Sequence, residues 1–153
     1  MPTKNLSLNI VNGSDYVSPD PFNTNFEKLD ALGLDYVVEG GTSGEWWYRK
    51  WKSGRAQCGI DYKEFGEQTL TQWVYTSLYA TNELSFGAYP FAFKSRPFTV
   101  VSFENDKLLA ARDSWVNLSN STSTTMSPSF RIVDASANPC SPACGIYVDG
   151  WYK

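Results

Sequence analysis

The sequence predicts a mainly β protein: a β-sandwich head of the jelly-roll type, preceded by a short N-terminal helix. Aromatic residues make up 16% of the chain and charged residues only 19%, a composition typical of strands rather than of helical bundles. About eight to ten short apolar stretches are separated by turn residues, which favours two packed sheets. A chain of 153 residues can build one core. We expect an arm and helical neck over residues 1–33 and the head domain over residues 34–153.

The first 33 residues predict an arm and one helix. Residues 1–19 predict a short strand or an extended arm. Asp20 can cap a helix, Pro21 suits its first position and Gly33 supplies a left-handed stop. Between them, apolar side chains at i, i+4, i+7 and i+10 form one stripe, made of Phe22, Phe26, Leu29 and Leu32. A helix of about three turns is marginal alone, so the stripe must pack either against the head or against other copies of the chain.

A hairpin is predicted over residues 45–61, with its turn at Ser53-Gly54. Folding about that turn pairs residues of one face as follows: Trp51 with Ala56, Arg49 with Cys58, and Trp47 with Ile60. This face is apolar apart from Arg49, and the opposite face is the wetter one. If the apolar face is the core, Arg49 needs a partner, because an unpaired buried charge is costly. A subunit interface would supply one; alternatively, Arg49 reaches the edge of the sheet.

Further strands are predicted by alternating and β-branched patterns over residues 69–80, 83–93, 98–103, 108–113, 130–133 and 145–151. Two segments have the composition of connections. The glycine-rich residues 40–44 are expected to join two strands. The polar, low-complexity residues 117–125 are expected to form a long exposed loop.

Charge and hydropathy exclude two classes of partner. The net charge is −3, and the basic residues form only one cluster, at Arg49, Lys50, Lys52 and Arg55, so we expect no nucleic-acid binding. We expect no membrane insertion, because no apolar stretch approaches the roughly 20 residues that span a bilayer. The N-terminal residues lack the apolar core of a signal peptide, so synthesis in a cytoplasm without such a peptide is expected.

The cysteines do not have a metal-ligand spacing. The chain has three of them, Cys58, Cys140 and Cys144, and no histidine, so neither a metal site nor another cofactor is expected. Cys140 and Cys144 lie four residues apart in a proline-containing loop. They could close a small disulfide in oxidising surroundings, and they could equally remain reduced thiols.

The sequence favours binding over catalysis. Without histidine, a serine or cysteine nucleophile has no imidazole base. A carboxylate pair could still cleave glycosidic bonds, but the sequence selects no such pair, and we expect no enzymatic activity. Six Trp and nine Tyr in a small domain imply exposed rings, which suit stacking on sugars or docking on proteins. The candidate ligand-binding residues are loop or terminal aromatics: Tyr89, Trp115, Tyr147, Trp151 and Tyr152.

Three stretches resemble a known family, the small tail-fibre or receptor-binding proteins of phages and prophages of Gram-positive, largely clostridial, bacteria. The stretches are residues 22–33, residues 35–51, which contain Thr42-Ser43-Gly44 and Tyr48-Arg49-Lys50-Trp51, and residues 145–153 with their terminal Tyr152-Lys153. The resemblance covers about a third of the chain, and its middle motif is the most specific part. The loop between Cys140 and Cys144 departs from the family pattern.

The resemblance implies a homotrimer in which a helical neck leads into a β-sandwich head that recognises the host cell surface. The stripe residues and Arg49 would then form the oligomer interface. The expected location is the virion, as part of a phage tail, and the expected ligand is a host cell-surface polysaccharide. One alternative is a purely structural virion protein that docks on other tail or baseplate proteins. A second alternative is a polysaccharide depolymerase.

Overall fold

The computed structural model of the chain describes residues 25, 27–28, 35–75, 77–105 and 114–153. Backbone contacts divide the chain into two units, residues 1–36 and residues 37–153; the sequence-based boundary was set after residue 33. Within the predicted helix, the described residues Asn25, Glu27 and Lys28 are helical. The stripe residues Phe22, Phe26, Leu29 and Leu32 lie outside the described residues.

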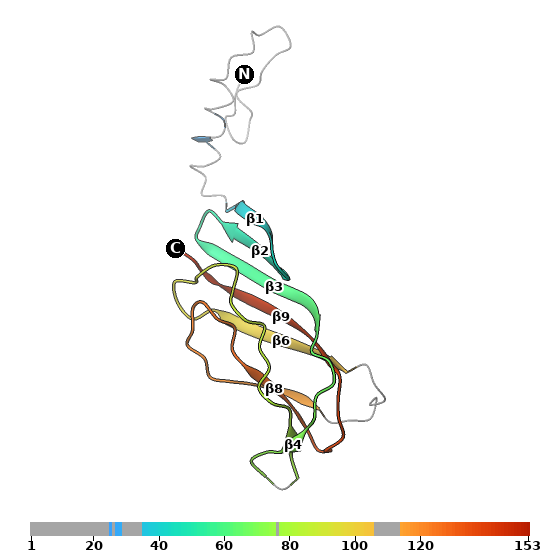
Figure 1. The fold of residues 1–153 in the computed structure, drawn as a ribbon. Coiled ribbons are helices and arrows are strands. Elements are labelled where there is room, and N and C mark those ends of the chain that lie inside the picture. The colour runs from blue at the N-terminus through green and yellow to red at the C-terminus, as the bar shows by residue number, and fades with distance from the viewer. Residues whose placement is uncertain (1–24, 26, 29–34, 76, 106–113) are drawn as a thin grey trace, which may run out of the picture. The chain divides into compact units, whose positions relative to one another are not determined.

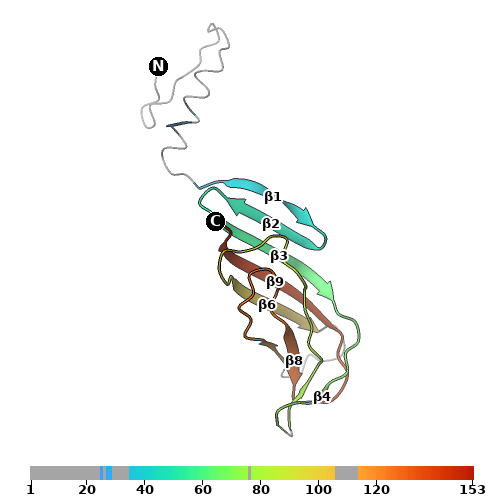
Figure 2. The same cartoon turned by 60° about the vertical axis from the view of Figure 1, so that its left-hand side comes forward.

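The unit of residues 37–153 contains two antiparallel sheets, which Figures 1 and 2 show from two sides. The first sheet has five strands, in the spatial order β1 (Val37–Ser43), β2 (Trp46–Trp51), β3 (Arg55–Glu64), β9 (Pro142–Trp151) and β6 (Phe98–Asn105). The second has four short strands, in the order β4 (Thr71–Gln72), β5 (Tyr79–Ala80), β8 (Phe130–Asp134) and β7 (Trp115–Leu118).

The strand pairing is nested. Strand β3 pairs with β9, and β5 pairs with β8. Strands β6 and β7 lie between these pairs in the sequence, and they add to β9 and β8 in the two sheets. This nesting is the order of a jelly-roll sandwich. The predicted fold class is therefore confirmed, and the nine strands of the described residues agree with the expected number.

One hydrophobic cluster joins the inner faces of both sheets. Strands β3 and β9 contribute alternate residues, because side chains of a strand point to opposite faces in turn; they are Ala56, Cys58, Ile60, Cys144, Ile146 and Val148. Strand β8 contributes Phe130 and Ile132 from the second sheet. The Phe130 ring stacks on Phe86 at a centroid distance of 5.3 Å.

The segment of residues 83–93 supplies aromatic side chains to the core without being a strand, so the strand predicted there is wrong. Its pairing is limited to isolated bridges at Leu84 and Ala88. Gly87 has a left-handed φ of 84°, and Pro90 has no amide hydrogen to donate, so neither supports a continuous ladder. The apolar residues of this segment nonetheless include buried side chains, namely Leu84, Phe86, Tyr89 and Phe93, with a change of parity at Gly87.

The hairpin of β2 and β3 exists, but its register differs by one residue from the predicted one. Tyr48 pairs with Cys58, and Arg49 pairs with Gln57. The amide of Gly54 donates to the carbonyl of Trp51 at 3.0 Å, and Gly54 has a φ of 95°. The loop is therefore one residue longer than a two-residue turn, and a one-residue shift exchanges the two faces of a strand.

This shift decides which face of β2 is buried. Trp46 is buried and Tyr48 packs against the core, whereas Trp47 lies on the outer face and Arg49 is exposed. Lys50, also on the inner side, lies over the rings of Tyr48, Phe91 and Tyr152 at 4.9–5.6 Å from their centroids. Arg49 therefore needs no buried partner.

The other strand predictions have mixed outcomes. Those at 98–103, 130–133 and 145–151 are confirmed as β6, β8 and β9. The strand predicted at 69–80 is only partly right, because within this range only residues 71–72 and 79–80 form strands, β4 and β5. Two expected connections are wrong, since residues 40–43 belong to β1 and residues 117–118 to β7. The predicted strand at 108–113 lies outside the described residues.

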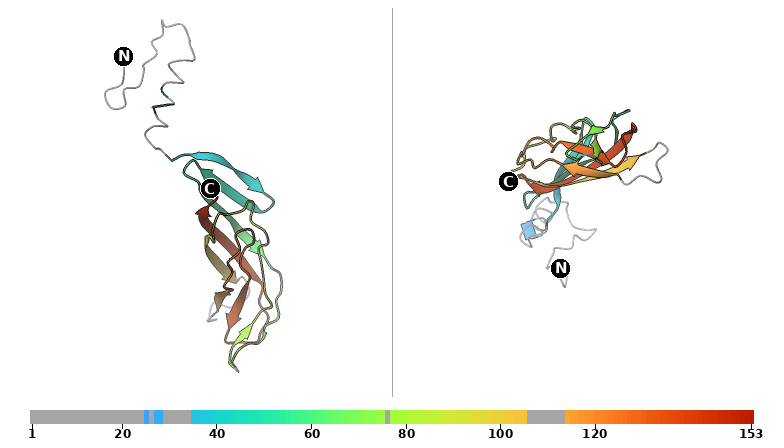
Figure 3. Two further views of the ribbon diagram at one scale, coloured as in Figure 1. Left: turned by 90° about the vertical axis from the view of Figure 1, so that its left-hand side faces the viewer. Right: turned by 90° about the horizontal axis from the view of Figure 1, so that it is seen from below.

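The C-terminus lies beside the turn that joins β2 and β3, as the views of Figures 1–3 agree. The amide of Tyr152 donates to the carbonyl of Gly54 at 2.9 Å. A side chain at position 54 would approach Lys153 to 2.9 Å. Glycine therefore provides both the left-handed turn and the room for the chain end.

Candidate functional site

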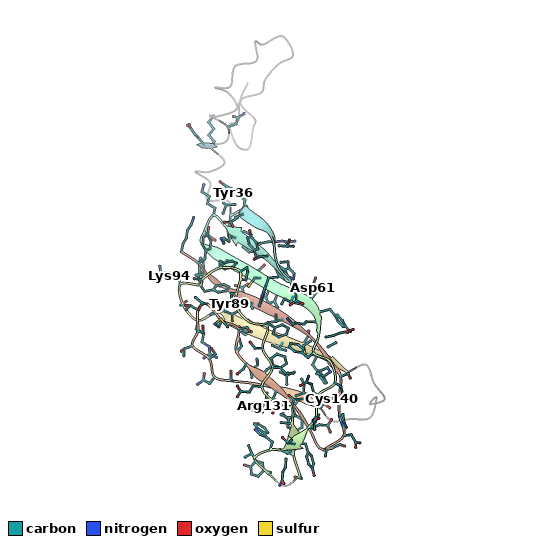
Figure 4. The ribbon with its side chains drawn as sticks, in the orientation of Figure 1. Tyr36, Asp61, Tyr89, Lys94, Arg131 and Cys140 are labelled. Carbon is teal, nitrogen blue, oxygen red and sulfur yellow. The ribbon has the colours of Figure 1, made fainter. Side chains whose placement is uncertain are left out.

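A cavity of about 300 Å³ lies between the start of β6 and the loop that follows β7. One wall is formed by Tyr89 and by the four consecutive residues Arg96, Pro97, Phe98 and Thr99. The other wall is formed by Leu118, Ser119, Ser121, Ser123 and Pro128. The cavity thus combines aromatic rings, hydroxyl groups and one cation. In Figure 4, Tyr89 and the nearby Lys94 lie toward one end of this unit, and Arg131 and Cys140 toward the other.

The serine-rich wall is held by backbone hydrogen bonds. The amides of Tyr89 and Phe93 donate to the carbonyls of Thr125 and Thr124, at 2.9 and 2.8 Å. The amide of Ser127 donates to the carbonyl of Gly87 at 2.9 Å. The expectation of a wholly exposed loop is therefore wrong for this segment. The core aromatics Tyr89 and Phe93 hold the loop in place through their backbone amides.

Serine side chains stabilise the loop from within. The Ser121 hydroxyl accepts a hydrogen bond from the Ser123 amide at 3.2 Å. The Ser123 hydroxyl accepts from the amides of Thr125 and Met126, at 3.2 and 3.0 Å. Such hydroxyl-to-backbone bonds favour tight turns over strands. The loop is pre-organised, which lowers the entropy that a ligand must remove on binding.

Tyr89 connects the cavity to the core. Its side chain is 7% exposed and contacts the rings of Trp46 and Phe93 edge to face, at 5.6 and 5.3 Å. Burial raises the pKa of the Tyr89 hydroxyl, while a hydrogen bond with Thr99 and the charge of Arg96 partly offset this rise. Tyr89 therefore stays protonated near neutral pH, with its polar end on the Thr99 and Arg96 side.

Arg96 is the charged residue of the cavity wall. Its Nη1 donates to Oδ1 of Asn120 at 3.1 Å, which holds the guanidinium against the serine-rich loop. The lining residues include neither Asp nor Glu. Phe98 borders the cavity and is 68% exposed. It pairs with Asp149, whereas Thr99 pairs with the buried Val148, so the Phe98 ring lies on the outer face of the sheet and Thr99 faces inward.

A second, shallower groove of about 220 Å³ lies on the outer face of the five-stranded sheet. The rings of Trp47 and Tyr147 lie on it with centroids 6.1 Å apart. Trp47 donates from Nε1 to Oδ1 of Asp61 at 2.8 Å. Gly59 pairs with both Trp47 and Tyr147, so its bare backbone forms the floor between the two rings.

Beside this groove, Asp149 accepts hydrogen bonds from three residues. Arg55 donates from Nε at 3.1 Å, Gln57 from Nε2 at 2.7 Å and Tyr147 from its hydroxyl at 3.3 Å. These bonds, with that from Arg55 the strongest, hold the pKa of the Asp149 carboxyl below its usual range, although burial acts in the opposite direction.

The structure separates the residues that were predicted to bind a ligand. Tyr89 lines the cavity. Tyr147 and Trp151 are exposed on the outer side of β9, and Trp115 is exposed on β7 of the other sheet. Tyr152 is half-buried, with its ring 6.4 Å from that of Phe91. These five aromatics do not form one site.

Sequence reasoning missed most of the cavity. The missed residues are Arg96, Phe98, Thr99, Ser119, Ser121 and Ser123. The serines at every second position, 119, 121 and 123, were a usable signal, because this spacing suits local turns. What the sequence could not show is that residues 96–99 lie across from them.

All three cysteines are buried. Burial raises the pKa of the Cys58 and Cys144 thiols to about 12. The disulfide between Cys140 and Cys144 stays a prediction. Within the described part of the chain, no three His, Cys, Asp or Glu side chains are grouped to hold a metal ion. The described residues also include no helix that is long and apolar enough to cross a membrane.

Comparison with known proteins supports the fold. No protein-family model and no curated protein matches the chain. Among solved structures, the chain is similar to the R1 pyocin fiber of P. aeruginosa, in a structure comprising its C-terminal residues 323–701, with a TM-score of 0.51 and 13% sequence identity. The match covers 81% of this chain and 30% of that one. The chain therefore shares its fold with part of a bacterial fibre protein.

Proposed function

We propose that this chain is a non-catalytic, tail-fibre-type protein that binds a bacterial surface saccharide in the cavity of Tyr89, Phe98 and Ser121. The observation that carries the proposal is the composition of this cavity: aromatic rings and hydroxyl groups on a pre-organised loop. The similarity to part of a pyocin fiber supports a fibre-type role. The sequence resemblance supports a phage or prophage tail as its location.

The cavity chemistry suits a sugar. A pyranose ring has an apolar face of C–H groups, which can pack on Leu118, a lining residue that is 39% exposed. Its hydroxyls both donate and accept hydrogen bonds, as do the side chains of Thr99, Ser119 and Ser121. A cavity of about 300 Å³ has the size of a small-ligand site. We therefore expect one or two sugar units of a host cell-wall or capsular polysaccharide to bind there.

The test is binding to an array of purified bacterial cell-wall and capsular polysaccharides, clostridial ones included. Leu118→Ala should lose roughly fivefold in affinity, because an apolar contact of this size contributes on the order of 1 kcal/mol. Tyr75→Ala is the control, since Tyr75 is 67% exposed, on the β4–β5 connection and outside the cavity. Binding to no polysaccharide, or equal binding by Leu118→Ala, would count against the proposal.

We also propose that the chain assembles as a homotrimer, with the stripe of Phe22, Phe26, Leu29 and Leu32 around the axis. The support is the stripe itself, which is too narrow for a buried helix but suits packing against copies of itself. Light scattering should give a mass of about three times 17.2 kDa. A monomer mass would contradict the assembly without affecting the cavity.

The outer sheet face favours a second candidate function, that of a structural virion component. Trp47, Tyr147 and Trp151 place three large rings there, and an exposed aromatic face of this kind suits docking on another tail or baseplate protein. This function predicts that Trp151→Ala weakens incorporation of the protein into virions, while polysaccharide binding is unchanged. Leu118→Ala should show the reverse pattern if the cavity is the functional site.

A further inference from the structure

We propose that the cavity selects acidic saccharides, which carry a carboxylate or phosphate group, and that Arg96 is the residue that recognises this group. The inference rests on the proposed function and adds the chemical class of its ligand. It depends on the charge of the cavity wall, on the hydrogen bonding of Arg96 and on the neutral donors around it.

The cavity has a positive charge without a compensating carboxylate. Arg96 lines it, and none of the ten lining residues is Asp or Glu. Several other cations of the described residues are paired with acids. Lys50 lies 3.0 Å from Glu39, Arg131 lies 3.3 Å from Glu83, and Arg55 is bonded to Asp149. Among the described residues, Arg96 contacts no carboxylate, and its hydrogen-bond partner is the neutral amide of Asn120.

The geometry leaves Arg96 ready for an oxyanion. One guanidinium nitrogen, Nη1, is bonded to Asn120 at 3.1 Å, which fixes the direction of the side chain. A guanidinium has five N–H donors in a planar fork that matches a carboxylate or a phosphate with two parallel bonds. Anchoring by one nitrogen lowers the entropy cost of ordering the side chain while the other donors of the fork remain for a ligand.

The surrounding groups fit the rest of an acidic sugar. Ser119 and Ser121 line the same cavity as Arg96 and can bond sugar hydroxyls, and Leu118 can contact the apolar face of the sugar. A carboxylate or phosphate would meet no like charge from the lining residues. A neutral saccharide would leave the Arg96 fork without an ionic partner, so it gains less from binding.

The experiment compares polymers that differ only in charge. Polygalacturonate is paired with its methyl-esterified, neutral form, and phosphomannan is paired with dephosphorylated mannan. The binding of the full chain to each polymer is measured by biolayer interferometry at low and high salt. The variants are Arg96→Gln, Arg96→Lys and Lys94→Gln. Lys94→Gln is the matched control. It removes one positive charge two residues from Arg96, and Lys94 does not line the cavity.

We expect wild-type protein to bind at least one acidic polymer at least tenfold more tightly than its neutral partner, because a hydrogen bond to a charged group contributes about 1.5–3 kcal/mol. The pair that shows the difference identifies the anion as carboxylate or phosphate. High salt should reduce the preference. Arg96→Gln should abolish it, Arg96→Lys should retain part of it, and Lys94→Gln should leave it nearly unchanged, with all melting temperatures alike.

Equal binding to acidic and neutral partners, a preference that survives in Arg96→Gln, or no binding to any of the four polymers would overturn the inference. The proposed function is judged separately by the polysaccharide array. A positive array with no charge preference here rejects acidic selectivity alone, and a negative array rejects saccharide binding as a whole.

Discussion

The guanidinium of Arg55 on β3 and the carboxylate of Asp149 on β9 form a two-point ion pair, in which Nε lies 3.1 Å from Oδ1. Gln57 donates a third bond to the same carboxylate at 2.7 Å. These bonds connect the two central strands of the five-stranded sheet, beside the groove of Trp47 and Tyr147. The network ties β9 to the hairpin of β2 and β3.

Because these bonds lower the pKa of Asp149 in the folded protein, the stability they contribute is present above the unfolded pKa of about 3.9. It is lost as the pH falls through the folded pKa. Asp149→Asn should therefore reduce the free energy of unfolding at pH 7 by on the order of 1 kcal/mol, a modest value because Arg55 is half exposed.

Denaturant unfolding from pH 7 down to pH 2.5 measures this effect. The difference from wild type should shrink at the acid end, and a constant difference would contradict the account. Glu67→Gln, at an exposed carboxylate, is the control.

Gly59 should tolerate no side chain. A Cβ there would lie 2.6 Å from the carbonyl oxygen of Ile146 and 2.7 Å from the Trp47 ring. Gly59→Ala should lower the free energy of unfolding by roughly 1–3 kcal/mol, as overpacking does. Gly41→Ala is the control, because a Cβ there would meet nothing closer than 3.8 Å. Urea unfolding of both variants decides the point, and equal stabilities would show that the sheet yields at Gly59.

The buried thiols should be unreactive while the protein is folded. The pKa of Cys58 and of Cys144 is about 12, since burial disfavours the thiolate, and the thiolate is the reactive form. In a Cys140→Ser background, a disulfide reagent at pH 8 should modify neither thiol over minutes in buffer and both in guanidinium chloride. Rapid modification in buffer would mean that the core opens at these positions.

Lys50 should stabilise the fold as a partly buried cation. Its ammonium lies 4.9 Å from the centroid of Phe91 and 5.4 Å from that of Tyr152, and it is also paired with Glu39. Lys50→Met keeps the length of the side chain and removes the charge, and loss of the cation–π attraction and of this ion pair should cost about 1 kcal/mol. Lys94→Met, at an exposed site, should change stability by less than about 0.5 kcal/mol. Thermal unfolding compares the two variants. An unchanged stability of Lys50→Met would contradict the stabilising role of Lys50.

The sequence was sufficient for the fold class because the apolar alternation that marks buried faces is local. Strands β6, β8 and β9 follow such alternation. The hairpin register was not predictable in the same way, since it depended on one extra loop residue before Gly54. That single residue exchanges the faces of Trp46 and Trp47, and with them the identity of the core aromatic.

The cavity was harder to predict for a different reason. Its two walls are separated by some 20 residues, and they meet because the amides of Tyr89 and Phe93 bond the carbonyls of Thr125 and Thr124. No local pattern encodes such a long-range contact. Tyr89 was identified as a candidate from its aromatic character, and the spacing of Ser119, Ser121 and Ser123 was a local signal for turns, whereas Arg96 had no feature in the sequence that distinguished it from a surface residue.

The central claim, that the cavity binds a saccharide, is tested most directly by NMR. Uniformly ¹⁵N-labelled protein is titrated with fragmented wall polysaccharide from clostridial cells, and amide shifts are followed. The account predicts concentration-dependent shifts at Thr99, Ser119 and Ser121, with those of Trp47 and Tyr147 on the outer sheet face unchanged. Shifts confined to the outer face, or no shifts at any amide, would contradict it.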